Sequence, residues 1–172
     1  MKNVFVLPTD KPSRVYLIKS NNRLGLTSTN PEYMENFGSG TQNQHLYITS
    51  DEEIKDCFVI NIHTNQVYFL EGYYGVQPRT KKIILTTDGD LIKEGVQSID
   101  DEFLQWYIKN PSCEEVEVEQ EILKLVHNPN YVNHTPEGDG IYLTPKSENL
   151  QYGETLIEDN VLDYKIIIPV QG

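Results

Sequence analysis

The clearest structural signal lies in Phe58-Val59-Ile60-Asn61-Ile62 and in Val67-Tyr68-Phe69-Leu70, two short runs that four polar residues separate. Both runs combine β-branched and aromatic residues, which is the composition of a half-buried strand. The link His63-Thr64-Asn65-Gln66 contains Asn65, a residue type that tolerates a positive φ angle and suits a short turn. We therefore predict an antiparallel hairpin over residues 58–70.

Similar short runs recur on both sides of this hairpin. Tyrosine is frequent, with 11 residues, and many tyrosines lie beside β-branched residues, as expected for a pleated surface. The segment 20–44 is rich in Asn, Gly, Ser and Thr, so it is predicted as a long polar loop. The remaining runs predict seven further strands, at residues 3–7, 14–18, 45–49, 82–86, 115–119, 140–144 and 164–168.

One helix is predicted over residues 101–109. Asp100 can cap the free amides of its first turn, and the acidic residues that follow favour the positive end of the helix dipole. Phe103, Leu104 and Tyr107 share one apolar stripe, which would pack the helix onto a sheet. Asn110-Pro111 ends the helix. A second short helix is predicted at residues 120–126.

These elements predict an α+β fold that is mainly antiparallel β, with one or two short helices. Most connections are too short for a parallel crossover, so a small, partly closed barrel or roll is the expected shape. The chain has 172 residues, which suits a single domain over residues 1–172.

The charge of the chain restricts the classes of partner. Its 26 acidic and 14 basic residues give a formal net charge of −12, which repels phosphates and argues against direct binding of DNA or RNA. The N-terminal residues do not form a signal peptide. No apolar run reaches the roughly 18 residues of a membrane helix, so we expect a cytosolic protein that binds no membrane. The sequence does not predict an oligomeric state.

The sequence contains no recognisable catalytic or metal-binding pattern, so no cofactor, metal or catalytic residue is predicted. His45, His63, His127 and His134 lack the short spacings of zinc ligands. Cys57 and Cys113 form no C-x-x-C motif. Asp88-Gly89-Asp90 resembles the opening of a calcium loop but lacks the later acidic ligands, so it is interpreted as a polar turn. Carboxylates are numerous, and an acid–base pair among them stays an open alternative.

The acidic run from Glu114 to Glu121 is the candidate partner-binding feature. In a strand, Val116 and Val118 would face the core, while Glu115, Glu117 and Glu119 would line the wet face about 6.8 Å apart, twice the strand rise. Phosphates along one DNA strand recur about every 3.4 Å, so such a row would match alternate phosphates at best. The alternative is the solvated face of a half-buried strand.

Three segments resemble a pattern found in an uncharacterised accessory protein family of tailed bacteriophages: Lys81-Lys82-Ile83-Ile84-Leu85-Thr86-Thr87-Asp88, Ile99-Asp100-Asp101-Glu102-Phe103-Leu104-Gln105-Trp106 and Val116-Glu117-Val118-Glu119. The segments 4–14 and 48–55 belong to the same pattern, which covers residues 1–119, and residues 164–169 resemble its usual end. The chain departs from the family at Asp56-Cys57-Phe58, where relatives often have a Gly-Asp-Trp turn. The family supplies no catalytic residues.

The resemblance implies a viral origin and an accessory role in the cytoplasm of an infected bacterium. The leading hypothesis is that the protein inhibits a host defence protein, such as a nucleic-acid-guided nuclease, by placing an acidic surface in its basic groove in an anti-CRISPR-like role. A virion or assembly component is one alternative. A small-ligand binding protein or an enzyme is another, and it would show a concave polar pocket.

Overall fold

The structure is a computed structural model that describes residues 1–27, 40–130, 138, 140–146 and 148–170. The chain divides into two compact units. Unit 1 comprises Met1–Glu117 and the C-terminal residues from Ile168, and unit 2 comprises Val118–Ile167. The sequence led us to expect one domain. Two compact units can still fold as a single cooperative domain, so that expectation stays a prediction.

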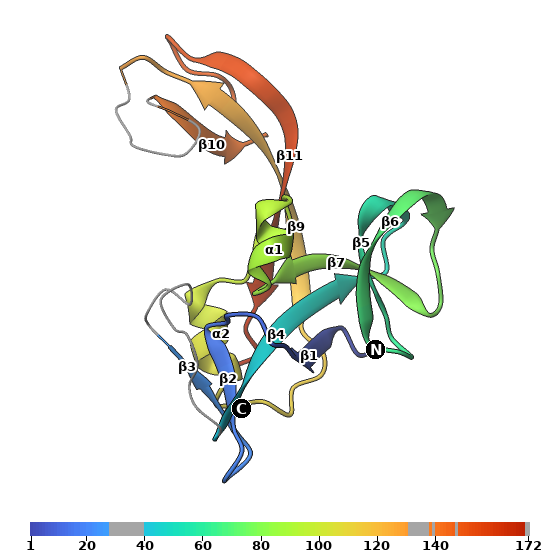
Figure 1. Cartoon of the computed structure of the whole chain (residues 1–172). Coiled ribbons are helices and arrows are strands. Elements are labelled where there is room, and N and C mark those ends of the chain that lie inside the picture. The colour runs from blue at the N-terminus through green and yellow to red at the C-terminus, as the bar shows by residue number, and fades with distance from the viewer. Residues whose placement is uncertain (28–39, 131–137, 139, 147, 171–172) are drawn as a thin grey trace. The chain divides into compact units, whose positions relative to one another are not determined.

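Unit 1 is built on a mainly antiparallel sheet in the order β3-β2-β4-β7-β5-β6, with β1 paired to β4 and β8 paired to β7 (Figure 1). Of the described pairings, β7–β8 is parallel. The expected shape was a small, partly closed barrel or roll. β3 and β6 are the two ends of the strand order, so the described strands do not close into a barrel. The strands are β1 (Val4–Pro8), β2 (Val15–Ile18), β3 (Arg23–Leu26), β4 (Thr41–Ser50), β5 (Ile54–Asn61), β6 (Gln66–Gly75), β7 (Thr80–Thr86) and β8 (Gln97–Ser98).

The predicted hairpin is confirmed as β5 and β6, which pair antiparallel with Phe58 opposite Phe69. Asn65 adopts a φ of 56° and its amide donates to Asn61 O, so the turn forms as its sequence indicated. Residues 56–58, where the suspected resemblance led us to expect a different turn, lie within β5. Asp56 has a φ of 42° at a register shift and accepts a hydrogen bond from the Gly72 amide at 2.7 Å.

The prediction of a loop over residues 20–44 is wrong at both ends, while residues 28–39 lie outside the described residues. β3 pairs with β2, and β4 begins at Thr41. Tyr16 lies opposite Gly25, and a Cβ at residue 25 would overlap the Tyr16 ring. Glycine weakens a strand on its own, but at residue 25 the absence of a side chain leaves room for the Tyr16 ring against β3.

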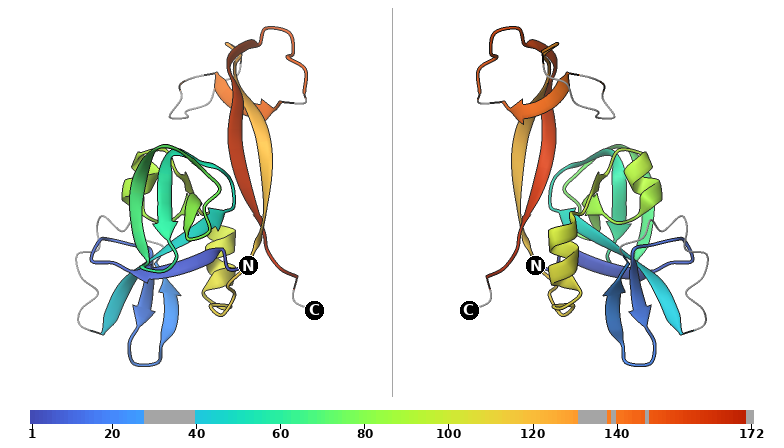
Figure 2. Two further views of the ribbon diagram at one scale, coloured as in Figure 1. Left: turned by 90° about the vertical axis from the view of Figure 1, so that its right-hand side faces the viewer. Right: turned by 90° about the vertical axis from the view of Figure 1, so that its left-hand side faces the viewer.

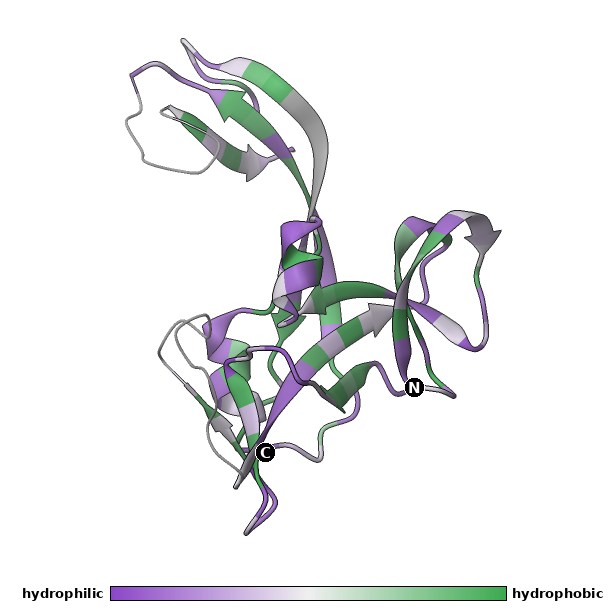
Figure 3. Cartoon of the chain, viewed as in Figure 1, coloured by the Kyte–Doolittle hydropathy of each residue, from purple (hydrophilic) through white to green (hydrophobic). Residues whose placement is uncertain are grey.

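The core of unit 1 lies around β1, β4 and β7, where apolar residues concentrate (Figure 3). The predicted helix is confirmed as α2 (Asp101–Tyr107), capped by Asp100 and burying Phe103, Leu104 and Tyr107. A second helix, α1 (Gly89–Lys93), follows β7. It was not predicted, because five residues give too short a periodic pattern to detect.

Unit 2 is a three-stranded sheet in the order β10-β9-β11 (Figure 2). Its strands are β9 (Glu117–His127), β10 (Ile141–Pro145) and β11 (Thr155–Ile167). The predicted helix at residues 120–126 is wrong, because this segment lies inside β9 and pairs antiparallel with β10. Leu123 and Val126 are buried there, and strand pairing prevails over the helical spacing. The α+β class with mainly antiparallel strands and short helices is confirmed.

Candidate functional site

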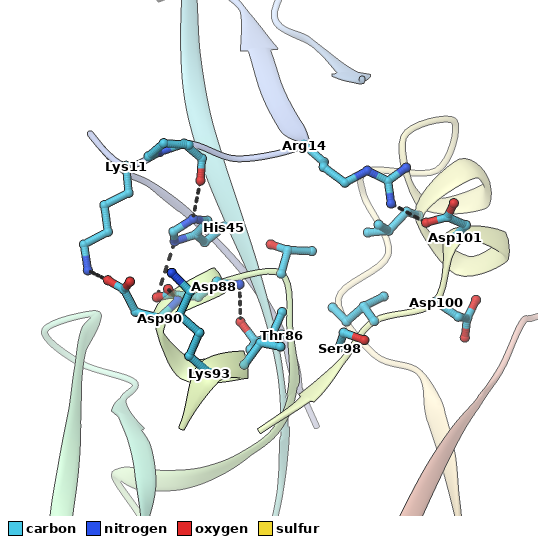
Figure 4. A pocket seen from close by; sticks show the side chains of 16 residues that line it. Lys11, Arg14, His45, Thr86, Asp88, Asp90, Lys93, Ser98, Asp100 and Asp101 are labelled. Carbon is cyan, nitrogen blue, oxygen red and sulfur yellow. Dashed lines mark hydrogen bonds and ion pairs between the residues drawn. The ribbon is translucent and has the colours of Figure 1, made fainter. Parts of the chain in front are cut away.

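A pocket of about 730 Å³ opens in unit 1 (Figure 4). Its volume lies within the range of small-molecule sites, about 300–1,000 Å³. The pocket is lined by the segment between β1 and β2, the end of β7, both helices, β8 and one residue of β4. The polar and charged lining residues are Lys11, Arg14, His45, Thr86, Thr87, Asp88, Asp90, Lys93, Ser98, Asp100 and Asp101. The pocket thus collects side chains that lie more than ninety positions apart in sequence.

A buried cluster of Asp88, His45 and Tyr47 anchors one wall. The Tyr47 hydroxyl donates to Asp88 Oδ2 at 2.9 Å, and His45 Nδ1 lies 3.4 Å from the same oxygen. Asp88 Oδ1 accepts from the Asp90 amide at 3.1 Å and so caps α1. His45 Nε2 lies 3.5 Å from the Pro12 carbonyl oxygen. The cluster therefore links β4, the first helix and the segment before β2.

The cluster keeps Asp88 ionised. Burial by itself raises the pKa of this carboxyl, but the hydrogen bond and charge of His45, the Tyr47 hydroxyl and the Asp90 amide outweigh burial and lower the pKa to about 2. Burial and then the Asp88 charge raise the pKa of Tyr47 above its ordinary value. Tyr47 therefore stays a neutral donor beside a fixed carboxylate.

Two ion pairs stand on the walls of the pocket. Lys11 pairs with Asp90 of α1, and Arg14 pairs with Asp101 of α2; we call these the wall pairs. The pKa of Lys11 is raised, chiefly by its hydrogen bond to Asp90. Arg14 Nε also donates to Thr27 O at 3.1 Å. The wall pairs tie the segment between β1 and β2 to both helices.

Apolar side chains and engaged hydroxyls complete the pocket. Ile99 and Leu104 are buried at its wall, and Ile92 is partly exposed. Thr86 Oγ1 donates to Leu46 O, and Thr87 Oγ1 accepts from the Leu46 amide. Both hydroxyls therefore form hydrogen bonds with the backbone, and neither faces a general base. The arrangement suits the binding of a molecule with an apolar body and polar ends.

The predicted glutamate row does not line this pocket. Val116 is buried and Val118 half-buried, while Glu115, Glu117 and Glu119 are exposed, as the alternation indicated. However, Glu115 precedes β9 and pairs with the Met1 amino group at 2.7 Å. Glu117 is the last residue of the N-terminal part of unit 1, and Glu119 belongs to unit 2. The row therefore crosses the boundary between the units, and one of its charges is offset within the chain.

Among the described residues, no three His, Cys, Asp or Glu side chains gather as metal ligands would. His45 lies in the cluster at the pocket, and His134 lies outside the described residues. In the part of the chain that the structure describes, no helix has the length and apolar character needed to cross a membrane.

No protein-family model, curated protein or solved structure matches the chain, so the resemblance to the phage family stays a prediction.

Sequence reasoning found parts of this site without assembling them. It recognised Asp100 as a helix cap, and Asp100 lines the pocket. The interpretation of residues 88–90 as a polar turn is wrong, because Asp88 caps α1 and the helix begins at Gly89. Sequence reasoning also missed the role of His45, because nothing local in β4 indicates that Asp88 lies beside it. The signal that remained unused was Asp88 as the N-cap of a very short helix.

Proposed function

We propose that the protein binds a small molecule in the pocket of unit 1. A cavity of this size, with a buried apolar part, fixed carboxylates and cations on its walls, is what supports this proposal. The cluster of Asp88, His45 and Tyr47 gives the pocket a preorganised wall, since each of these side chains is held by another. The role is one of binding, and the ligand would be recognised by its polar ends.

A fragment screen by saturation-transfer NMR tests this proposal. Gly89 lines the pocket, and a Cβ at this position would meet no heavy atom within 4 Å outside its chain neighbours and its own helix. Gly89→Trp therefore adds a large side chain at the pocket wall without a clash at Cβ, while Glu102→Trp places the same side chain on an exposed position of α2 that does not line the pocket. We expect fragments that bind the wild type and Glu102→Trp but not Gly89→Trp. If Gly89→Trp binds the same fragments equally well, the pocket is not the binding site.

The second candidate function is that of a phage accessory protein that occupies the basic groove of a host defence protein. The exposure of Glu115, Glu117 and Glu119 around the buried Val116, together with the net charge of −12, favours it. This role would place the protein in the cytoplasm of an infected bacterium.

A pull-down from infected cells, followed by binding kinetics, tests the second candidate. Replacing all three glutamates with glutamine removes three charges and keeps the side-chain size. We expect slower association with a basic partner, and an effect that shrinks as salt shortens the screening length to about 10 Å near 0.1 M. Equal association rates at low salt would show that the row is a solvated strand face.

A further inference from the structure

Two charges on the pocket walls have no partner charge within the described part of the chain. They are Lys93 and Asp100. The wall pairs are formed by other side chains, and no ion pair among the described residues includes Lys93 or Asp100. Both residues are exposed. A ligand that fills the pocket would have to leave these charges in water or pair with them.

The two charges lie on opposite sides of the pocket (Figure 4). Lys93 is in the last turn of α1, and Asp100 caps the N-terminus of α2. The Asp100 carboxylate is held in place because its Oδ1 accepts from the Phe103 amide at 2.7 Å. Ile99 and Leu104 contribute buried apolar surface to the same pocket. The walls thus offer a cation, apolar surface and a carboxylate.

We infer that the ligand is a zwitterion whose ammonium and carboxylate groups are separated by an apolar chain, such as an ω-amino acid or a short apolar peptide with free ends. This inference rests on the proposed function. The ammonium group would pair with Asp100, the carboxylate with Lys93, and the chain would cover Ile99 and Leu104. An α-amino acid carries both charges on one carbon, so it would reach one wall and leave the other charge unpaired.

The charge of the protein argues against an anionic ligand. The pocket is lined by four aspartates against two lysines and one arginine, and the chain as a whole carries −12. A phosphate or nucleotide would approach against this field. A zwitterion has no net charge, so it avoids that long-range repulsion while still pairing with both walls.

Three probes of equal chain length test the inference: 8-aminooctanoate, octylamine and octanoate, titrated into the labelled full-length protein at low salt and followed by amide chemical shifts. We expect all shifts to centre on residues 86–104 and the zwitterion to bind roughly fivefold more tightly than either analogue, the factor that one additional surface ion pair of about 1 kcal/mol gives. Equal affinities of the three probes would overturn the inference.

Two isosteric variants assign the ends. Lys93→Gln should abolish the preference for 8-aminooctanoate over octylamine, and Asp100→Asn should abolish the preference over octanoate. Asparagine caps helices about as well as aspartate, so α2 should persist, and Lys93→Gln tests the inference independently of that cap. Glu102→Gln lies beside the site without lining it and should leave all three affinities unchanged. If both preferences survive in both variants, the inference is wrong.

These results separate the inference from the proposed function. If fragments bind the wild type but not Gly89→Trp, and the three octyl probes bind equally, ligand binding in the pocket is supported and the zwitterionic ligand is rejected. If no fragment discriminates Gly89→Trp from Glu102→Trp, the pocket itself is rejected. Failure of all three probes to shift residues 86–104 while fragments bind there also rejects the zwitterion.

Discussion

At the residue scale, Asp88 is the side chain on which the pocket wall depends. It caps α1 and accepts from the buried Tyr47 hydroxyl. Asp88→Ala removes a cap and leaves that hydroxyl without its acceptor, so we expect a loss of about 2–4 kcal/mol in the free energy of unfolding. Urea denaturation measures it. Asp90→Ala removes an exposed ion pair two residues away and should cost less than about 1 kcal/mol; equal losses would contradict a structural role for Asp88.

Asp88 also predicts how stability depends on pH. Burial opposes its ionisation, but His45 and Tyr47 hold its pKa at about 2, below the ordinary 3.8. A folded-state pKa below the unfolded value stabilises the protein fully above pH 3.8, and this stabilisation is lost as the pH falls toward 2. Urea midpoints between pH 5 and 2 should fall more steeply for the wild type than for Asp88→Asn. Parallel curves would show that Asp88 is not preferentially ionised in the fold.

Residue types could be assigned local roles from sequence, but their partners could not. The caps and the positive φ of Asn65 are properties of a few neighbouring residues, so Asp100 and Asn65 were predictable. His45 and Asp88 lie more than forty positions apart in sequence, and their approach depends on the pairing of β4 with β7. Sequence alone contains no signal for a contact of that range.

At the scale of elements, the β5–β6 turn depends on Asn65. Its φ of 56° is a left-handed conformation that glycine adopts freely and β-branched residues avoid. We expect Asn65→Gly to change stability little and Asn65→Val to lower it by about 1–2 kcal/mol. Thermal or urea unfolding of the two variants compares them directly. Similar stabilities would mean that the turn relaxes to another conformation.

The cap of α2 makes a second prediction at this scale. Asp100→Ala should lower the free energy of unfolding by about 1 kcal/mol, because the Phe103 amide loses its acceptor, whereas Asp100→Asn should be nearly neutral. Urea denaturation of the two variants provides the comparison. A large loss with asparagine would indicate that the charge, and not the hydrogen bond, holds the helix.

Elements with a clear local strand pattern or cap were predicted, and those whose local composition favours another structure were not. The β5–β6 hairpin and α2 belong to the first group. β3 forms because Gly25 accommodates the Tyr16 ring of the neighbouring strand, and residues 120–126 form a strand because β10 pairs with them. Local composition favoured a loop and a helix at these two places.

At the scale of the whole molecule, the two compact units predict unequal protection. Unit 2 has three strands, and Leu123, Val126 and Ile166 are its buried apolar residues among those described. Unit 1 buries many more. Native-state hydrogen exchange should therefore be faster for amides of β9 and β10 than for those of β4 and β7. Equal opening free energies for the two units would contradict this prediction.

The most direct test of ligand binding is an amide chemical-shift map of the full-length protein with the tightest fragment from the screen. The account predicts shifts at the residues that line the pocket, in 11–14, His45 and 86–104, with the strands of unit 2 unchanged. Shifts confined to residues 118–127 and 140–146, or no saturable shift at the pocket at millimolar fragment, would contradict it.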